Sequence, residues 1–285
     1  MIHANAKINL SLDVVGTLPN GYHLVESVMT AVAFGDTIEL CETDGTGVKF
    51  SSDAPYLPSD KRNNCVKAAR LYYNSAGLER ALTVNCRKRI PVGGGLGGSS
   101  ADAAAVLLAL NRTHGIFTQK GLMQIGARIG ADVPFLIAGG TALATGIGEK
   151  LEPISPFRDE GIVIIRPEFS SSTPELFAAI ERNPPKMRPD TAALVMALSS
   201  GNLKTIGKLI YNVFEDALAP RERRMVYDAK SKLLEHGAVG ASMSGTGSAV
   251  FGLFDDLSVA KQAFLKLRES GTECFLTRAK NYAES

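Results

Sequence analysis

The 285-residue chain contains no tryptophan, only four cysteines, only four histidines and a net charge of only +2. The cysteines, Cys41, Cys65, Cys86 and Cys274, are scattered without C-x-x-C spacing, which is typical of reduced structural thiols in a cytoplasmic protein. No histidines have the spacing of a metal pair, so the sequence argues against a zinc site.

Long apolar runs and a strong charge of one sign are also missing. No stretch approaches the roughly 20 apolar residues that a membrane helix needs, and residues 1–7 lack the apolar core of a signal peptide. The small net charge gives no basic field for nucleic acid. We therefore expect a cytoplasmic globular protein, a monomer or weak homodimer, whose partner is a small molecule rather than nucleic acid or a membrane.

Glycine, in contrast, is concentrated in residues 91–105, which read PVGGGLGGSSADAAA. Glycine lets a backbone approach a ligand closely, and a helix starting at residue 101 would point unpaired N–H groups back into the loop. Together these features predict a phosphate site. A tight strand-to-helix turn is the purely structural alternative, but it needs fewer glycines.

Two common phosphate loops do not fit this stretch. A Walker A loop needs Lys followed by Ser or Thr after its last glycine, whereas Gly98 is followed by Ser99 and Ser100. The glycines do match G-x-G-x-x-G, but a dinucleotide fold expects an acidic residue about 20 positions later, and none occurs between Asp102 and Asp132.

Further polar residues stand where chemistry could use them. Residues 4–14 alternate strictly, which predicts a half-buried strand with Lys7 and Asn9 on its polar face. Asp132 precedes Val-Pro, where a turn role is the simpler explanation. Phosphoryl transfer needs a carboxylate and cations, and the glycine loop has no lysine of its own. A second glycine cluster, residues 240–248, is longer than a hairpin turn requires.

The predicted elements suggest two domains, residues 1–152 and 153–285. The first contains strands at 25–33, 37–42, 46–51 and 82–86, helices at 65–76, 101–111 and 118–129, and a hairpin at 138–149. The second contains strands at 162–166, 238–243, 249–254 and 272–277, and helices at 174–182, 191–199, 203–214, 222–236 and 258–270. This order predicts a ferredoxin-like α+β unit with extra helices.

Four blocks, residues 6–13, 91–105, 130–134 and 240–247, have the order and spacing of the GHMP kinases, a family that includes galactokinase, homoserine kinase and the mevalonate-pathway kinases. The chain is similar to this family along its whole length. The resemblance implies an α+β fold of two domains, the first like domain 2 of ribosomal protein S5 and the second ferredoxin-like. It also implies ATP as phosphoryl donor, Mg²⁺ as cofactor and an alcohol as acceptor.

The resemblance also implies roles for individual residues. Asp132 would accept the acceptor's hydroxyl proton, and Lys7 would hold Asp132 ionised and help place that hydroxyl. The implied ATP-binding residues are Pro91, Val92, Gly93, Gly94, Gly95, Leu96, Gly97, Gly98, Ser99, Ser100 and Ala101, with Asn64 and Lys88 near the adenosine. The implied substrate-binding residues are Asn9, Tyr22, His23, Phe177 and Gly245.

Gly21-Tyr22-His23 and residues 130–135 resemble the branch of the family whose acceptor is a cytidine diphosphate sugar alcohol of the non-mevalonate isoprenoid route. An aromatic ring would stack on the base and an imidazole would read its edge. The serines of the loop stand one place early, so Ser99 and Ser100 are both candidates to meet the phosphates or Mg²⁺. Another family kinase, such as homoserine kinase, a non-catalytic nucleotide sensor and a structural partner protein are the alternatives.

Overall fold

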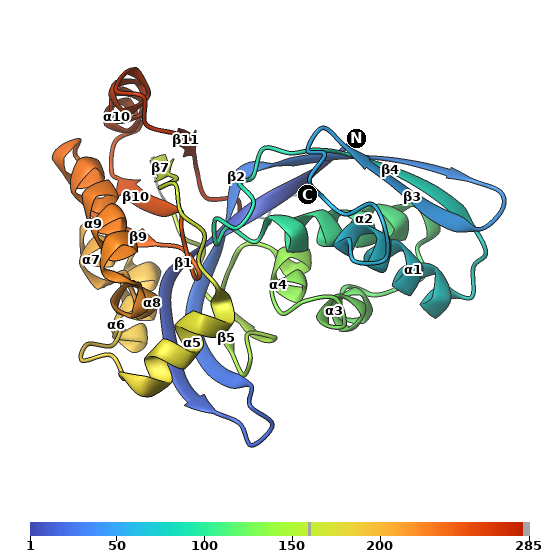
Figure 1. Ribbon diagram of the computed structural model, residues 1–285, viewed down its shortest axis with the longest axis horizontal. Helices are drawn as coiled ribbons and strands as arrows, with labels where there is room; N and C mark the ends of the chain where they lie inside the picture. The colour runs from blue at the N-terminus through green and yellow to red at the C-terminus, as the bar shows by residue number, and fades with distance from the viewer. Residues whose placement is uncertain (159–160, 282–285) are drawn as a thin grey trace. The chain divides into compact units, whose positions relative to one another are not determined.

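The computed structural model describes residues 1–158 and 161–281, and the chain forms two compact units (Figure 1). Unit 1 contains residues 1–6, 34–92 and 97–139, and unit 2 contains residues 7–33, 93–96 and those from 140 onward. Two long strands, β1 (Ile2–Thr17) and β2 (His23–Thr43), each contribute to both units. These compact units do not test the expected division into domains at 152/153, which stays a prediction.

In unit 1, the second half of β2 pairs antiparallel with β4 (Ala81–Arg87), and β3 (Gly47–Ser52) pairs parallel with β4. Helices α1 to α4 lie on one side of these strands (Figure 1). Their bounds are Asn64–Ala76, Gly98–His114, Gln119–Ala127 and Val133–Ala138. The glycine-rich loop thus leads from β4 directly into α2.

The start of α2 is decided by glycine rather than by a capping side chain. Gly97 is the N-cap residue at φ +73°, a conformation that is costly for other residues. The helix begins at Gly98, three residues before the expected start, and no side chain caps its first turn. Its alanines are almost all buried, so small side chains allow the neighbouring helix α1 to pack closely.

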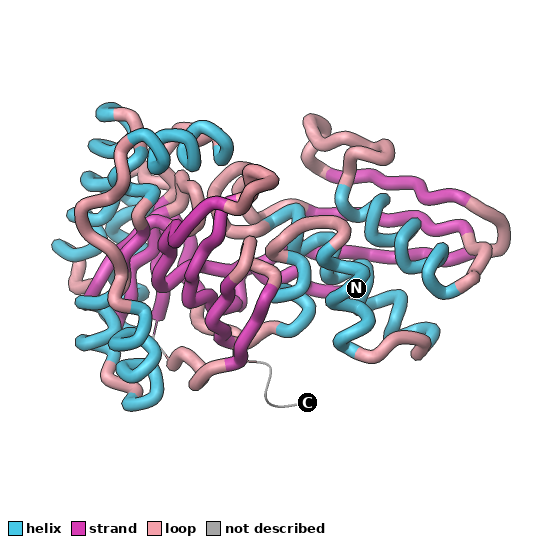
Figure 2. Tube along the Cα trace, turned by 90° about the horizontal axis from the view of Figure 1, so that it is seen from below, coloured by secondary structure: helices cyan, strands magenta, loops and turns pink. Residues whose placement is uncertain are grey.

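In unit 2, four antiparallel strands form a sheet in the order β11-β7-β10-β9, which confirms the ferredoxin-like expectation. Their bounds are Cys274–Thr277, Gly161–Ile165, Val250–Phe254 and Gly240–Met243. Helices α9 (Pro220–Glu235) and α10 (Leu257–Glu269) pack on this sheet (Figure 2). The additional helices are α5 (Thr173–Arg182), α6 (Thr191–Ser200), α7 (Leu203–Leu209) and α8 (Phe214–Ala217).

The structure corrects four expectations about local structure. The strand β1 is buried on both faces, not on one. The expected helix over 203–214 is broken by β8 (Tyr211–Asn212), which pairs parallel with β1. The expected hairpin over 138–149 lies later, as β5 (Thr141–Thr145) and β6 (Lys150–Pro153), because α4 occupies the chain up to Ala138. The expected strands 25–33 and 37–42 are both parts of β2.

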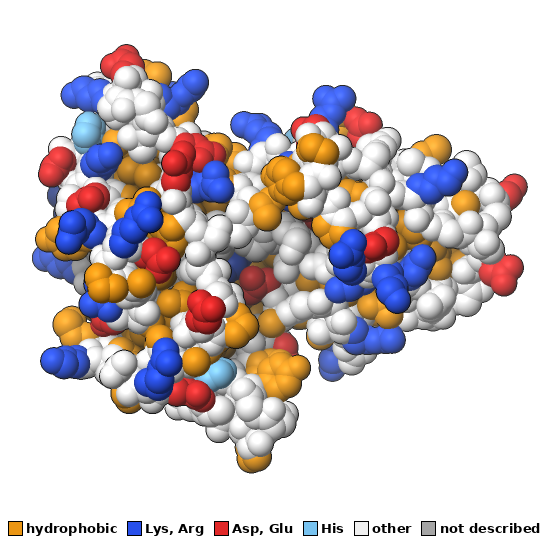
Figure 3. Space-filling view, in the orientation of Figure 1, with side chains coloured by type: hydrophobic (Ala, Val, Ile, Leu, Met, Phe, Trp, Pro, Cys, Tyr) orange, Lys and Arg blue, Asp and Glu red, His pale blue; other side chains and the backbone are white. Residues whose placement is uncertain are grey.

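Acidic and basic side chains are interspersed over the helices of unit 2 on the face that Figure 3 shows. Within the described residues, no helix has both the length and the apolar composition to cross a bilayer.

Candidate functional site

The polar face of β1 is a buried hydrogen-bonded group rather than a solvated strand face. Lys7 and Asn9 are only 4% and 3% exposed. The Lys7 ammonium donates to Asn9 Oδ1 at 2.6 Å, and the backbone N–H of Gly245 donates to the same oxygen at 2.9 Å. Asn9 Nδ2 donates in turn to Ser27 Oγ at 2.8 Å. Asn9 therefore holds Lys7 and the second glycine cluster together within unit 2.

The first half of the glycine loop packs against that second cluster. Ser244 Oγ donates to the carbonyl of Gly95 at 2.9 Å, and a Cβ added at Gly95 would lie 2.0 Å from the Ser244 carbonyl oxygen. The Lys7 N–H donates to the Leu96 carbonyl at 3.0 Å. Close packing thus explains Gly95, but Gly93, at φ +72°, has open space around the position of its missing Cβ. Gly93 is where a ligand could approach the backbone.

The second half of the loop opens α2 within unit 1. Asn64, the first residue of α1, donates from Nδ2 to Ser99 Oγ at 3.2 Å. Ser100 Oγ lies 3.6 Å from the position that a Cβ would take on Gly130, just before Asp132. The unpaired N–H groups of the first α2 turn, two serine hydroxyls and the 130–132 turn therefore gather in one place.

Asp132 stands at the N-cap position of α4 and is half-buried. Its carboxylate does not cap the helix, while its carbonyl accepts from the N–H of Leu136 at 3.1 Å. The turn role that the Val-Pro context suggested therefore belongs to the backbone of Asp132 and not to its carboxylate. Lys7 belongs to unit 2 and Asp132 to unit 1, so their joint role stays a prediction.

The structure places the Lys88 ammonium inward, next to two carboxylates. It contacts Asp36 and donates to Asp102 Oδ2 at 2.7 Å, and all three side chains are buried. Burial opposes the charge of Lys88, but Asp102 and Asp36 outweigh it, so the pKa of Lys88 is raised above its ordinary value. Burial, reinforced by Asp36 and opposed by Lys88, raises the pKa of Asp102 to about 7. The expected adenosine contact of Lys88 is not tested by this arrangement.

The residues of the expected base pocket lie together in unit 2. The rings of His23 and Phe177 are stacked, with centroids 4.2 Å apart and planes 19° from parallel. His23 Nε2 lies 3.0 Å from Glu181 Oε1, which also accepts from Thr17 Oγ1 at 3.0 Å. Tyr22 is 58% exposed on the turn before β2. Phe177 also packs edge-on against a core ring, which confirms its packing role, while its role in binding a ligand stays a prediction.

Two anchors of the second glycine cluster have no motif that sequence reasoning could use. Asn212 in β8 donates from Nδ2 to the carbonyls of Met243 and Gly245, both at 2.8 Å. Glu215 accepts from Ser242 Oγ at 2.9 Å and from the Met243 N–H at 2.8 Å. The expected helix over 203–214 hid the strand position of Asn212, and Glu215, which directly follows that range, belongs to no motif in the sequence.

Magnesium would fit the serine turn of unit 1. The described residues contain no cluster of three or more His, Cys, Asp or Glu that could enclose a metal. Mg²⁺ in kinases typically uses one or two protein oxygens together with water and substrate phosphates. The hydroxyls of Ser99 and Ser100 and the Asp132 carboxylate supply oxygens of this kind within unit 1.

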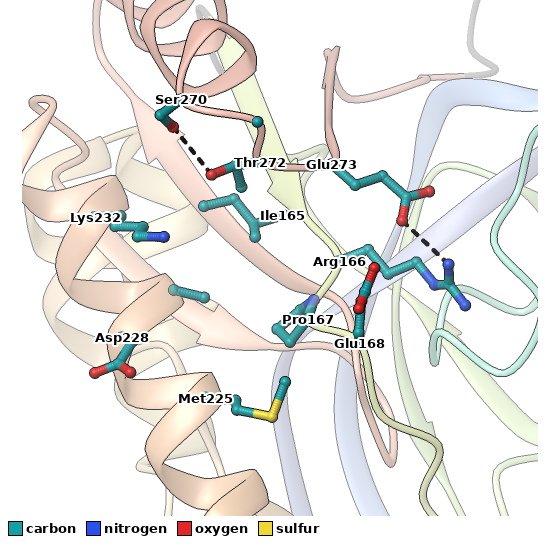
Figure 4. Close-up of a pocket in the computed structure, with 12 residues that line it drawn as sticks. Ile165, Arg166, Pro167, Glu168, Met225, Asp228, Lys232, Ser270, Thr272 and Glu273 are labelled. Atoms are coloured by element: carbon teal, nitrogen blue, oxygen red, sulfur yellow. Dashed lines mark hydrogen bonds and ion pairs between the residues drawn. The ribbon is translucent and has the colours of Figure 1, made fainter.

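A separate pocket of about 380 Å³ opens elsewhere in unit 2, between the end of β7, α9 and the turn after α10 (Figure 4). Its charged rim includes Asp228, Lys232 and an ion pair between Arg166 and Glu273 at 3.1 Å. None of the expected site residues lines it.

Known proteins similar to this chain match nearly its whole length. The family described as "GHMP kinases N terminal domain" matches residues 63–140, and "GHMP kinases C terminal" matches residues 194–273. A 4-diphosphocytidyl-2-C-methyl-D-erythritol kinase of Clostridium botulinum (strain Alaska E43 / Type E3) is 38% identical over 97% of this chain and 99% of its own. The enzyme of the same name from Acetivibrio thermocellus is 39% identical over 97% of this chain and 98% of its own.

Two solved structures of kinases are also similar to this chain. A crystal structure of 4-(cytidine 5'-diphospho)-2C-methyl-D-erythritol kinase matches with a TM-score of 0.83 and 30% identity, covering 98% of each chain. A homoserine kinase from Cytophaga hutchinsonii matches with a TM-score of 0.73, 22% identity and coverage of 97% of this chain and 95% of its own, which shows a shared fold. The sequence relatives, the family matches and the ferredoxin-like half all agree, and the chain belongs to the GHMP kinase family.

Proposed function

We propose that this kinase transfers the γ-phosphoryl group of ATP to the C2 hydroxyl of 4-diphosphocytidyl-2-C-methyl-D-erythritol. The observation that carries phosphoryl transfer is the buried Lys7 ammonium, held by Asn9 beside both glycine clusters. A buried lysine is costly unless it has a task or partners, and a kinase needs a cation near the transferred group. The similarity over nearly the full length to kinases of that name supports this acceptor.

The base pocket supports a cytidine group. The stacked pair of His23 and Phe177 offers flat apolar faces at which a base can stack, and Tyr22 supplies a third ring on an exposed turn. Glu181 fixes one nitrogen of His23, which leaves the other to hydrogen-bond the edge of a base. An acceptor without a base, such as homoserine, would leave these groups unused.

The chemistry follows from the residues of the chain. The open backbone at Gly93 and the N–H groups at the start of α2 would bind the phosphates, and Lys7 would neutralise charge on the transferred group. The acceptor oxygen bonds to the γ-phosphorus while the bond from that phosphorus to the bridging oxygen of ADP breaks. The hydroxyl proton passes to Asp132. Mg²⁺, held by the phosphates with Ser99 or Ser100, would supply further charge neutralisation.

Replacing Asp132 by Asn tests the catalytic part of this proposal. The amide cannot accept the proton, so we expect turnover to fall by about 10²-fold or more while ATP still binds. Turnover is measured by coupling ADP release to NADH oxidation, and ATP binding by calorimetry. Asn has nearly the same shape as Asp, and the Asp132 carboxylate does not cap α4, so we expect Asp132→Asn to fold normally. Turnover equal to that of the wild type would remove Asp132 from the mechanism.

A further inference from the structure

A buried charge cluster in unit 1 joins the two ends of the glycine loop. Lys88 lies three residues before Pro91, where the implied ATP-binding residues begin, and Asp102 directly follows Ala101, where they end. Their side chains meet at 2.7 Å and are 8% and 7% exposed. The pair therefore closes the base of the loop as a direct link between two residues that are 14 positions apart.

A second carboxylate fixes that base to the sheet of unit 1. Asp36 on β2 is fully buried and contacts the Lys88 ammonium with one oxygen. Its other oxygen accepts from the N–H of Arg89 and, at 2.8 Å, from the N–H of Ile90. The Asp36 carboxylate is therefore held by three groups: the N–H groups of Arg89 and Ile90, which precede the loop, and the Lys88 ammonium.

The cluster also contacts the first turn of α2. A Cβ added at Gly98 would lie 3.0 Å from Ile90 and 3.6 Å from the Lys88 ammonium, so the start of the helix rests on the same group. Asp102 Oδ1 is buried and has no hydrogen-bond partner within the described residues. A purely structural ion pair would be expected to satisfy both oxygens, because an unsatisfied buried oxygen costs stability.

We propose that Lys88 is a positioning residue: its ion pair with Asp102, anchored by Asp36, clamps the base of the phosphate-binding loop in its binding conformation. A clamped loop has less conformational entropy to lose when it orders around an anion, so its affinity for the anion is higher. The clamp acts on the triphosphate and not on the nucleoside. It rests on the proposed use of ATP, but not on the identity of the acceptor.

The clamp and a purely electrostatic effect predict opposite changes in anion affinity for Asp102→Ala. Removing a negative charge near a phosphate site would tighten anion binding if only electrostatics mattered. Releasing the loop would weaken it, and we expect about a tenfold loss. Asp102→Asn keeps an acceptor for Lys88 and should lose much less. Asp44→Ala, which removes a fully exposed partner of Arg80 in the same unit, controls for the change of net charge.

Binding of ATP and of inorganic tripolyphosphate is measured by calorimetry on the full chain, without acceptor, at about pH 8, where the Asp102 carboxyl is ionised. Asp102→Ala and Lys88→Met should weaken both ligands by the same factor, raise the KM for ATP and leave the KM for the acceptor unchanged. Hydrogen exchange of the amides in residues 92–101 should speed up relative to the rest of the chain. Should Asp102→Ala not fold, Asp102→Ser takes its place, because it also removes the carboxylate that Lys88 contacts.

Two results would overturn the clamp. One is unchanged or tighter binding of tripolyphosphate by Asp102→Ala. The other is a loss by Lys88→Met for ATP alone, which would make Lys88 an adenosine contact. If the protein fails to phosphorylate the cytidine acceptor but both ligands weaken together, the clamp stands and only the proposed acceptor is wrong.

Discussion

Gly93 and Gly95 have different roles in the structure, although both stand in the same glycine-rich stretch of sequence. Gly95 and Gly93 both have positive φ values, of +74° and +72°. Only Gly95 lies against another backbone, that of Ser244, whereas Gly93 faces open space. The sequence predicted phosphate binding for the whole run, and it could not separate a packing glycine from one that leaves room for a ligand.

A matched pair of alanine variants separates these roles. Gly95→Ala adds a clash with backbone to the strain of positive φ, so we expect it to lower the free energy of unfolding by about 2 kcal/mol or more. Gly93→Ala adds strain alone, about 1 kcal/mol, but its methyl group enters the space proposed for phosphate. Urea unfolding should therefore rank Gly95→Ala as less stable, and ATP binding should still weaken in Gly93→Ala. Equal stability of the two variants would contradict this assignment.

Asp102 makes stability depend on pH in a defined direction. Burial raises its pKa from 3.8 to about 7, so the folded protein keeps a proton that the unfolded chain releases. The contribution of Asp102 to the free energy of unfolding therefore falls as the pH rises from about 4 to 7 and is constant above that range. The thiols of Cys65 and Cys86 nearby stay neutral there, because burial raises their pKa values.

Asp102→Asn cannot titrate, so it should gain stability relative to the wild type across that interval. Urea unfolding at several pH values measures the difference between the two proteins, with the exposed Asp44→Asn as control. Parallel pH curves for wild type and Asp102→Asn would show that the carboxyl has an ordinary pKa.

At the scale of elements, periodicity found most helices and strands but missed those set by distant partners. The pattern of residues 203–214 is helical, yet Tyr211–Asn212 pairs with β1 and Asn212 reaches the second glycine cluster. The alternation of β1 was read correctly as a strand. The sequence predicted a half-buried strand, but partners such as Ser27 and Gly245, far away in sequence, also bury its polar face. Local patterns cannot report such partners.

The β8 connection gives a prediction of its own. Asn212→Ala removes two hydrogen bonds to the carbonyls of Met243 and Gly245 and leaves buried oxygens without a donor. We expect a loss of about 2–3 kcal/mol in the free energy of unfolding. We also expect a higher KM, because Gly245 is held next to Lys7 through Asn9. Asn202→Ala, which removes only the N-cap of α7, should cost about 1 kcal/mol and leave KM unchanged.

For Asn212→Ala, urea unfolding reports stability, and steady-state kinetics report KM. A variant as stable as Asn202→Ala would mean that the second glycine cluster does not depend on β8.

At the scale of the whole molecule, motifs in the sequence were enough to predict the family and the type of reaction. Gly-Leu-Gly-Gly-Ser-Ser, Lys7 and residues 130–134 were recognisable because a phosphate site needs particular residues at fixed spacing. The division into two compact units was not recognisable from the sequence, because β1 and β2 each run through both units and β5 pairs with β2. The boundary at Pro153 was predicted from a local change in composition, whereas the compact units depend on which strands pair.

The central claim is the identity of the acceptor, and initial rates with purified protein test it most directly. ATP, Mg²⁺ and equal concentrations of 4-diphosphocytidyl-2-C-methyl-D-erythritol, homoserine or mevalonate are compared in parallel, with ADP release as the readout. We predict turnover with the cytidine diphosphate compound and a rate indistinguishable from the acceptor-free background with the other two. Turnover with homoserine or mevalonate, and none with the cytidine compound, would contradict the account.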